Sequence, residues 1–236
     1  MARRVGAAVL AAGLVLGSGV VWGAGPAEAA ANMPEASWQL NDVRTATGDA
    51  TMKDSVGSHD GRVGSDVVLT GTAFRFPFVK PNSGIFRPQH LVTVPDAPAL
   101  NPGAGDWAVT MQFTTRNAFG NMIQKGQAGA TGGYFKMQMP KGIVSCLFRG
   151  AAGSRSVNSG VALNDGLPHA IRCERVGTAV TMTIDGASVR RATGPTGLIT
   201  NTEPLSIAGK TNCDGTTITC DYWVGTMEQI SIDVGA

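Results

Sequence analysis

After residue 31, apolar and polar residues alternate with a period of two, and helical periodicity is nearly absent. This spacing places every second side chain on the same face of a strand, so each such segment predicts a strand with one buried face. The positions that we expect in the core share this alternation, and they are Phe74, Phe76 and Phe78; Trp107, Val109, Met111 and Phe113; Phe135, Met137 and Met139; Val144, Cys146 and Phe148; and Val180, Met182 and Ile184.

Turn signals separate these segments. Asp60-Gly61, Asp165-Gly166 and Asp185-Gly186 supply residues that tolerate a positive φ angle. About a dozen short strands joined in this way predict an all-β fold, a two-sheet antiparallel β-sandwich or jelly roll. No internal repeat and no long linker interrupts the pattern, so we expect one domain over residues 31–236.

Residues 1–30 differ from the rest of the chain. Arg3 and Arg4 precede an uncharged, apolar stretch from Val5 to Pro26, which ends at the small-residue sequence Ala27-Glu28-Ala29. This order predicts a secretory signal peptide, and the alternative is an uncleaved membrane anchor. The glycines in the stretch favour cleavage, so we expect a secreted, extracellular product with no membrane span.

The mature chain is nearly neutral. Without Arg3, Arg4 and Glu28 it keeps 17 basic and 16 acidic residues. We see no basic patch or charge run, which argues against a nucleic acid or an anionic membrane as the partner. The oligomeric state is not determined by any feature of the sequence.

Four cysteines lie in the exported part, namely Cys146, Cys173, Cys213 and Cys220. An even number in an oxidising compartment predicts two disulfides, and four cysteines allow three pairings. The short spacing of Cys213 and Cys220 suits a bond within one loop, which leaves Cys146 with Cys173. Metal binding is the alternative, but no Cys-x-x-Cys and no nearby histidine completes a zinc site.

The segment LNDGLPHAIRC, residues 163–173, has two interpretations. A thiol enzyme would pair His169 with a free Cys173 thiolate. A turn at Asp165-Gly166 followed by a strand from about His169 would instead direct Cys173 into the core, beside Cys146. We favour the second interpretation, because both cysteines occupy core-facing positions.

Several segments resemble, in order, the laminin G-like members of the concanavalin A-like lectin/glucanase superfamily, in a secreted bacterial form. They span residues 36–234 and comprise ASWQLND, DSVGSHDGRV, VTVPDAPALNPGAGDWAVTMQFTT, NMIQKG with GGYFKMQM, LNDGLPHAIRC with MTIDG, and DYWVGTMEQISI. The resemblance implies the sandwich fold. It departs from the family at Pro168, where tryptophan is common, and at Glu228, where aspartate is usual. Because this fold carries lectins, adhesion modules, hydrolases and lyases, function has to be argued from the site.

Catalytic motifs are missing. Glycan hydrolases need paired carboxylates, and the Glu-x-Asp-x-x-Glu strand of laminarinase-type enzymes is absent. Tyr134-Phe135-Lys136 matches a fragment of alginate lyases, but their Gln-hydrophobic-His and Arg-x-Glu strands are absent. We therefore do not expect an enzyme.

Calcium is the metal that the resemblance implies. Asp54 and Asp60 flank a loop rich in glycine and serine, and Glu228 lies where the alternation of the last strand changes phase, which predicts a β-bulge. We predict a structural calcium held by Asp54 and Glu228, with Asp60 and Asp42 as further candidates. The alternative is that these carboxylates are solvated.

The polar positions of the central strands offer a ligand surface. Tyr134, Lys136, Gln138, Arg149 and Arg172 stand opposite the core positions and form one patch if their strands are neighbours. Planar donors and an aromatic ring suit carbohydrate. We predict a secreted, non-catalytic module that binds carbohydrate or a cell-surface ligand; the alternatives are a polysaccharide hydrolase or lyase, an adhesion or structural module, and an ordinary solvated sheet face.

Overall fold

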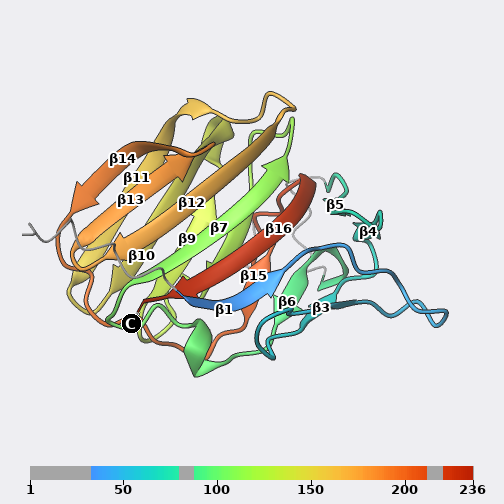
Figure 1. The fold of residues 1–236 in the computed structure, drawn as a ribbon, viewed down its shortest axis with the longest axis horizontal. Helices are drawn as coiled ribbons and strands as arrows, with labels where there is room; N and C mark the ends of the chain where they lie inside the picture. The colour runs from blue at the N-terminus through green and yellow to red at the C-terminus, as the bar shows by residue number, and fades with distance from the viewer. Residues whose placement is uncertain (1–32, 80–87, 212–219, 236) are drawn as a thin grey trace, which may run out of the picture.

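The computed structural model describes residues 33–79, 88–211 and 220–235. In this part of the chain the strands form two antiparallel sheets stacked face to face (Figure 1). The all-β sandwich expected from the alternation is therefore confirmed. Residues 1–30, the predicted signal peptide, lie outside the described residues.

Sheet A has its strands in the order β14-β13-β12-β7-β16-β5-β4, and β1 also pairs with β16. Their bounds are β1 Met33–Trp38, β4 Val68–Leu69, β5 Phe74–Phe76, β7 Trp107–Thr114, β12 Pro168–Val176, β13 Ala179–Ile184, β14 Ala187–Thr193 and β16 Gly225–Val234.

Sheet B has the order β11-β10-β9-β8-β15-β6-β3-β2. Its strands are β2 Thr51–Met52, β3 Gly61–Val63, β6 Val92–Val94, β8 Asn121–Lys125, β9 Tyr134–Gln138, β10 Ile143–Gly150, β11 Gly153–Ala162 and β15 Leu205–Ile207. Three short 3-10 helices, η1 Pro88–His90, η2 Pro98–Leu100 and η3 Pro140–Gly142, lie between strands. Within the described ranges, no helix is long and apolar enough to cross a membrane.

The core lies between the sheets. The alternating positions of β7, β9, β10 and β13 are buried, as predicted. Trp107 of sheet A contacts Phe135 and Phe148 of sheet B, with ring centroids 4.7 and 5.8 Å apart. One predicted position is wrong: Phe78 is 69% exposed. Strand β5 ends at Phe76, because Pro77 has no backbone N–H to continue the sheet ladder.

The disulfide between Cys146 and Cys173 is confirmed. It joins β10 of sheet B to β12 of sheet A across the buried interior, with the Cα atoms 6.3 Å apart. Its presence removes the free thiolate that a Cys173–His169 enzyme would need. Cys220 is also disulfide-bonded, but its predicted partner Cys213 lies outside the described residues.

The turn before β12 also agrees with the prediction. Gly166 has a φ of 85°, and the Asp165 carboxylate accepts a hydrogen bond of 2.8 Å from the Leu167 N–H. His169 then lies between two carboxylates, 3.3 Å from Asp165 and 2.9 Å from Asp185. Burial disfavours the charged imidazole, but the hydrogen bonds with these carboxylates outweigh it and raise the pKa of His169.

Candidate functional site

The residues predicted to bind a ligand fall on both sheets. On β9, Tyr134, Lys136 and Gln138 alternate with core residues, and the neighbouring strand β10 places Arg149 directly opposite Tyr134. These four therefore share the outer surface of sheet B. Arg172 does not join them, because β12 belongs to sheet A.

Arg172 is instead part of an ionic network on the other side of the sandwich. Its guanidinium contacts Glu174 at 3.1 Å and also the Asp233 carboxylate, and it donates to the Thr110 hydroxyl at 3.1 Å. Glu174 is thus ion-paired with Arg172. These contacts hold Arg172 on sheet A, apart from the other four predicted residues.

A first hollow opens beside Tyr134 and Arg149. It measures about 370 Å³, and its remaining wall consists of small residues, namely Gly129, Ala130, Gly132, Gly133, Gly150 and Ala151. A Cβ on Gly133 would lie 2.2 Å from the Arg149 carbonyl oxygen, so only glycine allows this loop to approach the strand so closely. Tyr134 is only 6% exposed, so its ring does not form an open platform on which a sugar could stack.

A second hollow, of about 230 Å³, lies beside Gln138 and is also lined by Asn121, Met139 and Asp221. Asn121 is 1% exposed, and its amide nitrogen donates to Gln124 at 3.0 Å. Within the part of the chain that the structure describes, its amide oxygen is buried without a hydrogen-bond partner, which is uncommon in a folded protein. Asp221 adopts a φ of 48°, a backbone strain of the kind often found at functional sites. Asn121, which lines the second hollow, thus has a buried acceptor without a donor among the described residues.

The same surface carries positive charge, which the sequence analysis missed. Residues 107–164, which form β7 to β11, contain no Asp or Glu but six basic residues, namely Arg116, Lys125, Lys136, Lys141, Arg149 and Arg155. Lys125 is buried and paired with Asp96 at 2.6 Å, so it adds no charge to the surface. The acid lining the second hollow, Asp221, is paired with Lys210 at 2.6 Å. The even charge balance of the whole chain conceals this local excess, and a count by segment would have found it.

Comparison with known sequences decides the family. The sequence model of the laminin G domain matches residues 113–233, just over half of the chain. The chain belongs to the laminin G domain family. The resemblance inferred from the sequence is therefore confirmed. No curated protein gives a significant match.

Solved structures agree with this laminin G assignment at the level of the fold. The binding domain of botulinum neurotoxin serotype D has a TM-score of 0.58 at 10% identity, over 86% of this chain and 47% of that one. The binding domain of botulinum neurotoxin DC in complex with SialylT has a TM-score of 0.52 at 10% identity, over 83% and 47%. Domains LG4-5 of the mouse laminin alpha1 chain have a TM-score of 0.48 at 18% identity, over 56% and 36%. The chain spans about a third to a half of the length of these structures. The two matches with TM-scores above 0.5 support the sandwich fold.

The predicted calcium ligands of this laminin G domain are engaged with donors. The Asp54 carboxylate accepts hydrogen bonds from the backbone N–H groups of Ser37, Val56 and His59 at 2.9 to 3.1 Å. Burial opposes the ionised form, but these bonds outweigh it and lower the pKa of Asp54. Asp60 is paired with Lys53 at 2.6 Å. Donors thus occupy the oxygen atoms that a calcium ion would need.

Glu228 does lie at a β-bulge, because the pairing of β16 with β7 shifts register between Met227 and Gln229. No hydrogen bond or ion pair within the described residues joins Glu228 to Asp54. In that same part of the chain, no group of three or more His, Cys, Asp or Glu side chains is placed to hold a metal ion. Calcium binding by Asp54, Asp60 and Glu228 therefore stays a prediction.

Proposed function

We propose that this protein is a secreted, non-catalytic module that binds carbohydrate on the outer surface of β8 to β10. The observation that carries the proposal is the Asn121 amide oxygen, which is buried without a protein donor in the hollow beside Gln138. Leaving such an acceptor unpaired costs about 1–3 kcal/mol, and a ligand hydroxyl would recover part of this free energy. Sugars present many hydroxyl groups in fixed geometry.

The neighbouring groups suit the same ligand class. The Gln138 side chain can both donate to and accept from a hydroxyl group, and the exposed Arg149 can donate one hydrogen bond to each of two neighbouring hydroxyl oxygens. The complex of a botulinum neurotoxin binding domain with SialylT supports the idea, although that structure shares only the fold with this chain. The laminin G family and the intramolecular disulfide are both in keeping with an extracellular location.

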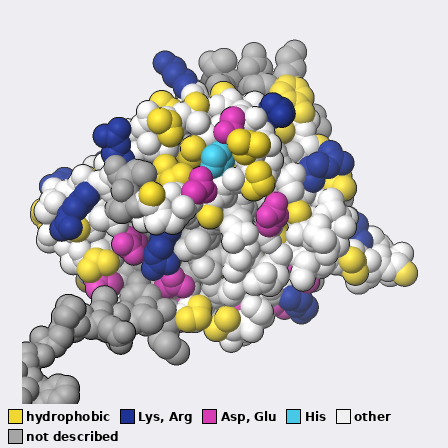
Figure 2. Space-filling model, turned by 45° about the horizontal axis from the view of Figure 1, so that its top comes forward, with side chains coloured by type: hydrophobic (Ala, Val, Ile, Leu, Met, Phe, Trp, Pro, Cys, Tyr) yellow, Lys and Arg dark blue, Asp and Glu magenta, His cyan; other side chains and the backbone are white. Residues whose placement is uncertain are grey.

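A protein partner is less well supported. Large exposed hydrophobic side chains in the described residues are few and lie on separate elements, as with Val43, Phe78, Val161 and Leu198. On the face drawn in Figure 2, charged side chains are interspersed with small, separate hydrophobic groups. An adhesive surface would be expected to expose a contiguous apolar patch.

The test is a glycan and polysaccharide array with the mature protein, followed by titration of the best ligand against three variants. Asn121→Leu and Arg149→Ala should each weaken binding about tenfold, because each removes a group that pairs with the ligand. Arg172→Ala is the matched control: it removes an arginine from the other sheet and should leave the affinity unchanged. Melting curves of every variant separate loss of binding from loss of folding.

Two outcomes would contradict the proposal. One is the absence of binding to any glycan on the array. The other is a glycan whose affinity falls with Arg172→Ala but not with Asn121→Leu or Arg149→Ala, since that ligand would bind sheet A.

A further inference from the structure

A third hollow, of about 260 Å³, lies toward the opposite edge of sheet B from β10 and β11. Its walls are the loop 44–50, strands β3 and β6, and η1. Ala50, Val63 and Pro88 line part of it, and the other side chains are polar, namely Arg44, Asp49, Arg62, Ser65, Gln89 and Thr93. It shares no lining residue with the two hollows of the proposed carbohydrate site.

Backbone contacts hold the walls of this hollow in place. The Gly64 N–H donates to the Leu91 carbonyl at 2.8 Å, and the Asp66 N–H donates to the Gln89 carbonyl at 2.9 Å. A Cβ on Gly64 would lie 2.2 Å from the Gln89 carbonyl oxygen, so a glycine is required for η1 to pack against the end of β3. The hollow is therefore a formed feature of the fold.

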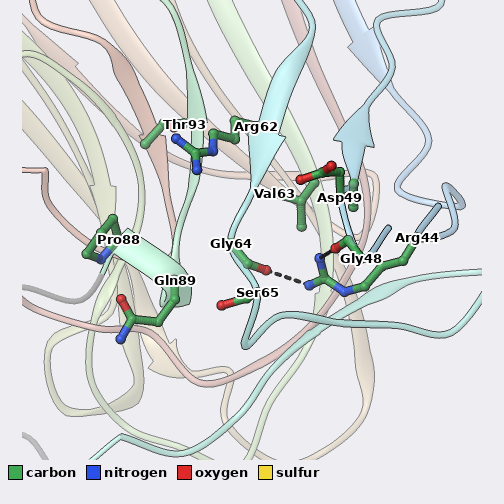
Figure 3. A pocket seen from close by; sticks show the side chains of 11 residues that line it. Arg44, Gly48, Asp49, Arg62, Val63, Gly64, Ser65, Pro88, Gln89 and Thr93 are labelled. Atoms are coloured by element: carbon green, nitrogen blue, oxygen red, sulfur yellow. Dashed lines mark hydrogen bonds between the residues drawn. The ribbon is translucent and has the colours of Figure 1, made fainter. Parts of the chain in front are cut away.

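Arg44 closes one side of the hollow. Its guanidinium donates to three backbone carbonyls, those of Gly48 at 3.1 Å, Gly64 at 2.6 Å and Val67 at 2.7 Å. Figure 3 shows the bond to Gly64 and shows Arg62 next to Thr93 at the far side of the hollow. Carbonyl groups satisfy the donors of Arg44 but do not neutralise its charge.

The charges around the hollow are unbalanced. Arg62 is exposed, and none of the described residues forms an ion pair or hydrogen bond with its side chain. The Asp49 carboxylate accepts one bond from a described side chain, the Thr47 hydroxyl at 3.2 Å. Two guanidinium groups face one carboxylate, so the hollow keeps one net positive charge and favours an anion.

We propose that this hollow is a second ligand site that takes a small polyhydroxy carboxylate. The ligand carboxylate would pair with the two-pronged guanidinium of Arg62, which is the strongest arrangement available for such an ion pair. The ligand hydroxyl groups would donate to Asp49 and exchange hydrogen bonds with Thr93, Ser65 and Gln89. The volume is below the roughly 300–1,000 Å³ of sites for drug-sized ligands, so it suits one sugar-sized molecule.

The experiment is an NMR titration of the ¹⁵N-labelled mature protein with sodium glucuronate, sodium gluconate and glucose at constant ionic strength. We expect at least one of the two carboxylates to shift the amide signals of Gly64, Ser65 and Gln89. Glucuronate alone would indicate a preference for the ring form, and gluconate alone for the open chain. Glucose should bind about tenfold more weakly or not at all, because it lacks the group that pairs with Arg62.

Variants assign the charge. Arg62→Ala should weaken carboxylate binding about tenfold or more. Arg62→Lys should weaken it less, because lysine keeps the positive charge but cannot donate two parallel hydrogen bonds to the carboxylate. Arg75→Ala is the matched control, since Arg75 is an exposed arginine on β5 of sheet A. The amide spectrum of each variant reports whether the fold is intact.

The proposal is overturned if neither carboxylate shifts these signals, if glucose shifts them equally, or if Arg62→Ala binds as well as the wild type. None of these results would bear on the carbohydrate site over β8 to β10. Conversely, failure of the glycan array would leave the third hollow unaffected, because the two sites use different residues.

Discussion

The bond between Cys146 and Cys173 should account for a large share of the stability of this domain. It is the covalent link between the two sheets within the described residues, and both cysteines are fully buried. The perturbation is the double variant Cys146→Ala/Cys173→Ala. Reduction with a thiol would be less specific, because Cys220 is disulfide-bonded as well.

The magnitude follows from the length of chain that the bond closes. The two cysteines are 27 residues apart. In the chain-entropy treatment, a loop of that size restricts the unfolded chain by about 3.5 kcal/mol at 25 °C. Removing two buried sulfur atoms also leaves space in the core, which adds to the loss. We therefore expect the free energy of unfolding to fall by about 3.5 kcal/mol or more.

The assay is urea unfolding followed by tryptophan fluorescence. A loss of this size should lower the midpoint by roughly 1–2 M, and the slope m should rise because an uncrosslinked unfolded chain exposes more surface. A loss below about 1 kcal/mol with an unchanged slope would refute the reasoning, since it would mean that the bond restricts the unfolded chain very little.

Three further predictions concern buried or paired charges. Asp54→Ala should lower the free energy of unfolding by about 2 kcal/mol, because it removes the acceptor of three backbone N–H groups. Urea unfolding should give the same loss in calcium and in EDTA. If wild-type protein loaded with calcium melts at a lower temperature after EDTA is added, that result would instead support a calcium site. His169 has a raised pKa beside Asp165 and Asp185, so its contribution to the free energy of unfolding should be fully present below about pH 6.5 and lost as pH rises through the folded-state pKa. The difference in stability between the wild type and His169→Gln should therefore shrink above pH 7. A difference that grows with pH would contradict this prediction. Arg175 is 1% exposed and donates to backbone carbonyls, with no ion-pair partner among the described residues. Arg175→Met should therefore lower the free energy of unfolding by about 3 kcal/mol or more. An unchanged stability in urea titration would show that these carbonyls find other donors.

The fold could be predicted because alternation and burial have the same physical cause. Every second side chain of a strand points between the sheets, so apolar residues such as Met111 and Met137 recur at these positions. The prediction that Phe78 lies in the core is wrong, because the two-residue alternation does not account for Pro77, which ends the sheet ladder. The disulfide was predictable for the same reason as the core, since Cys146 and Cys173 occupy inward positions of their strands.

The candidate site was predictable only in part. The alternation of side chains along β9 places Lys136 and Gln138 on the outer surface, as predicted. Alternation does not show which sheet a strand belongs to, so Arg172 was grouped with strands of the other sheet. Asn121 gave no signal at all, because an unsatisfied amide oxygen depends on what the loops around it fail to provide. Such information exists only in three dimensions.

This difference between core and loops explains why the family assignment does not transfer a ligand. The laminin G match covers residues 113–233, and the strands in this range bury the apolar surface that the sandwich fold requires. The hollows are formed elsewhere, by the loop 129–133, by Asp221 with its positive φ, and by Gly64 at the end of β3. A structural neighbour with 10% identity can keep the strands while replacing every one of these loops. Specificity in this chain should therefore follow the loop residues, so that exchanging 129–133 for another loop changes the ligand while the sandwich remains stable.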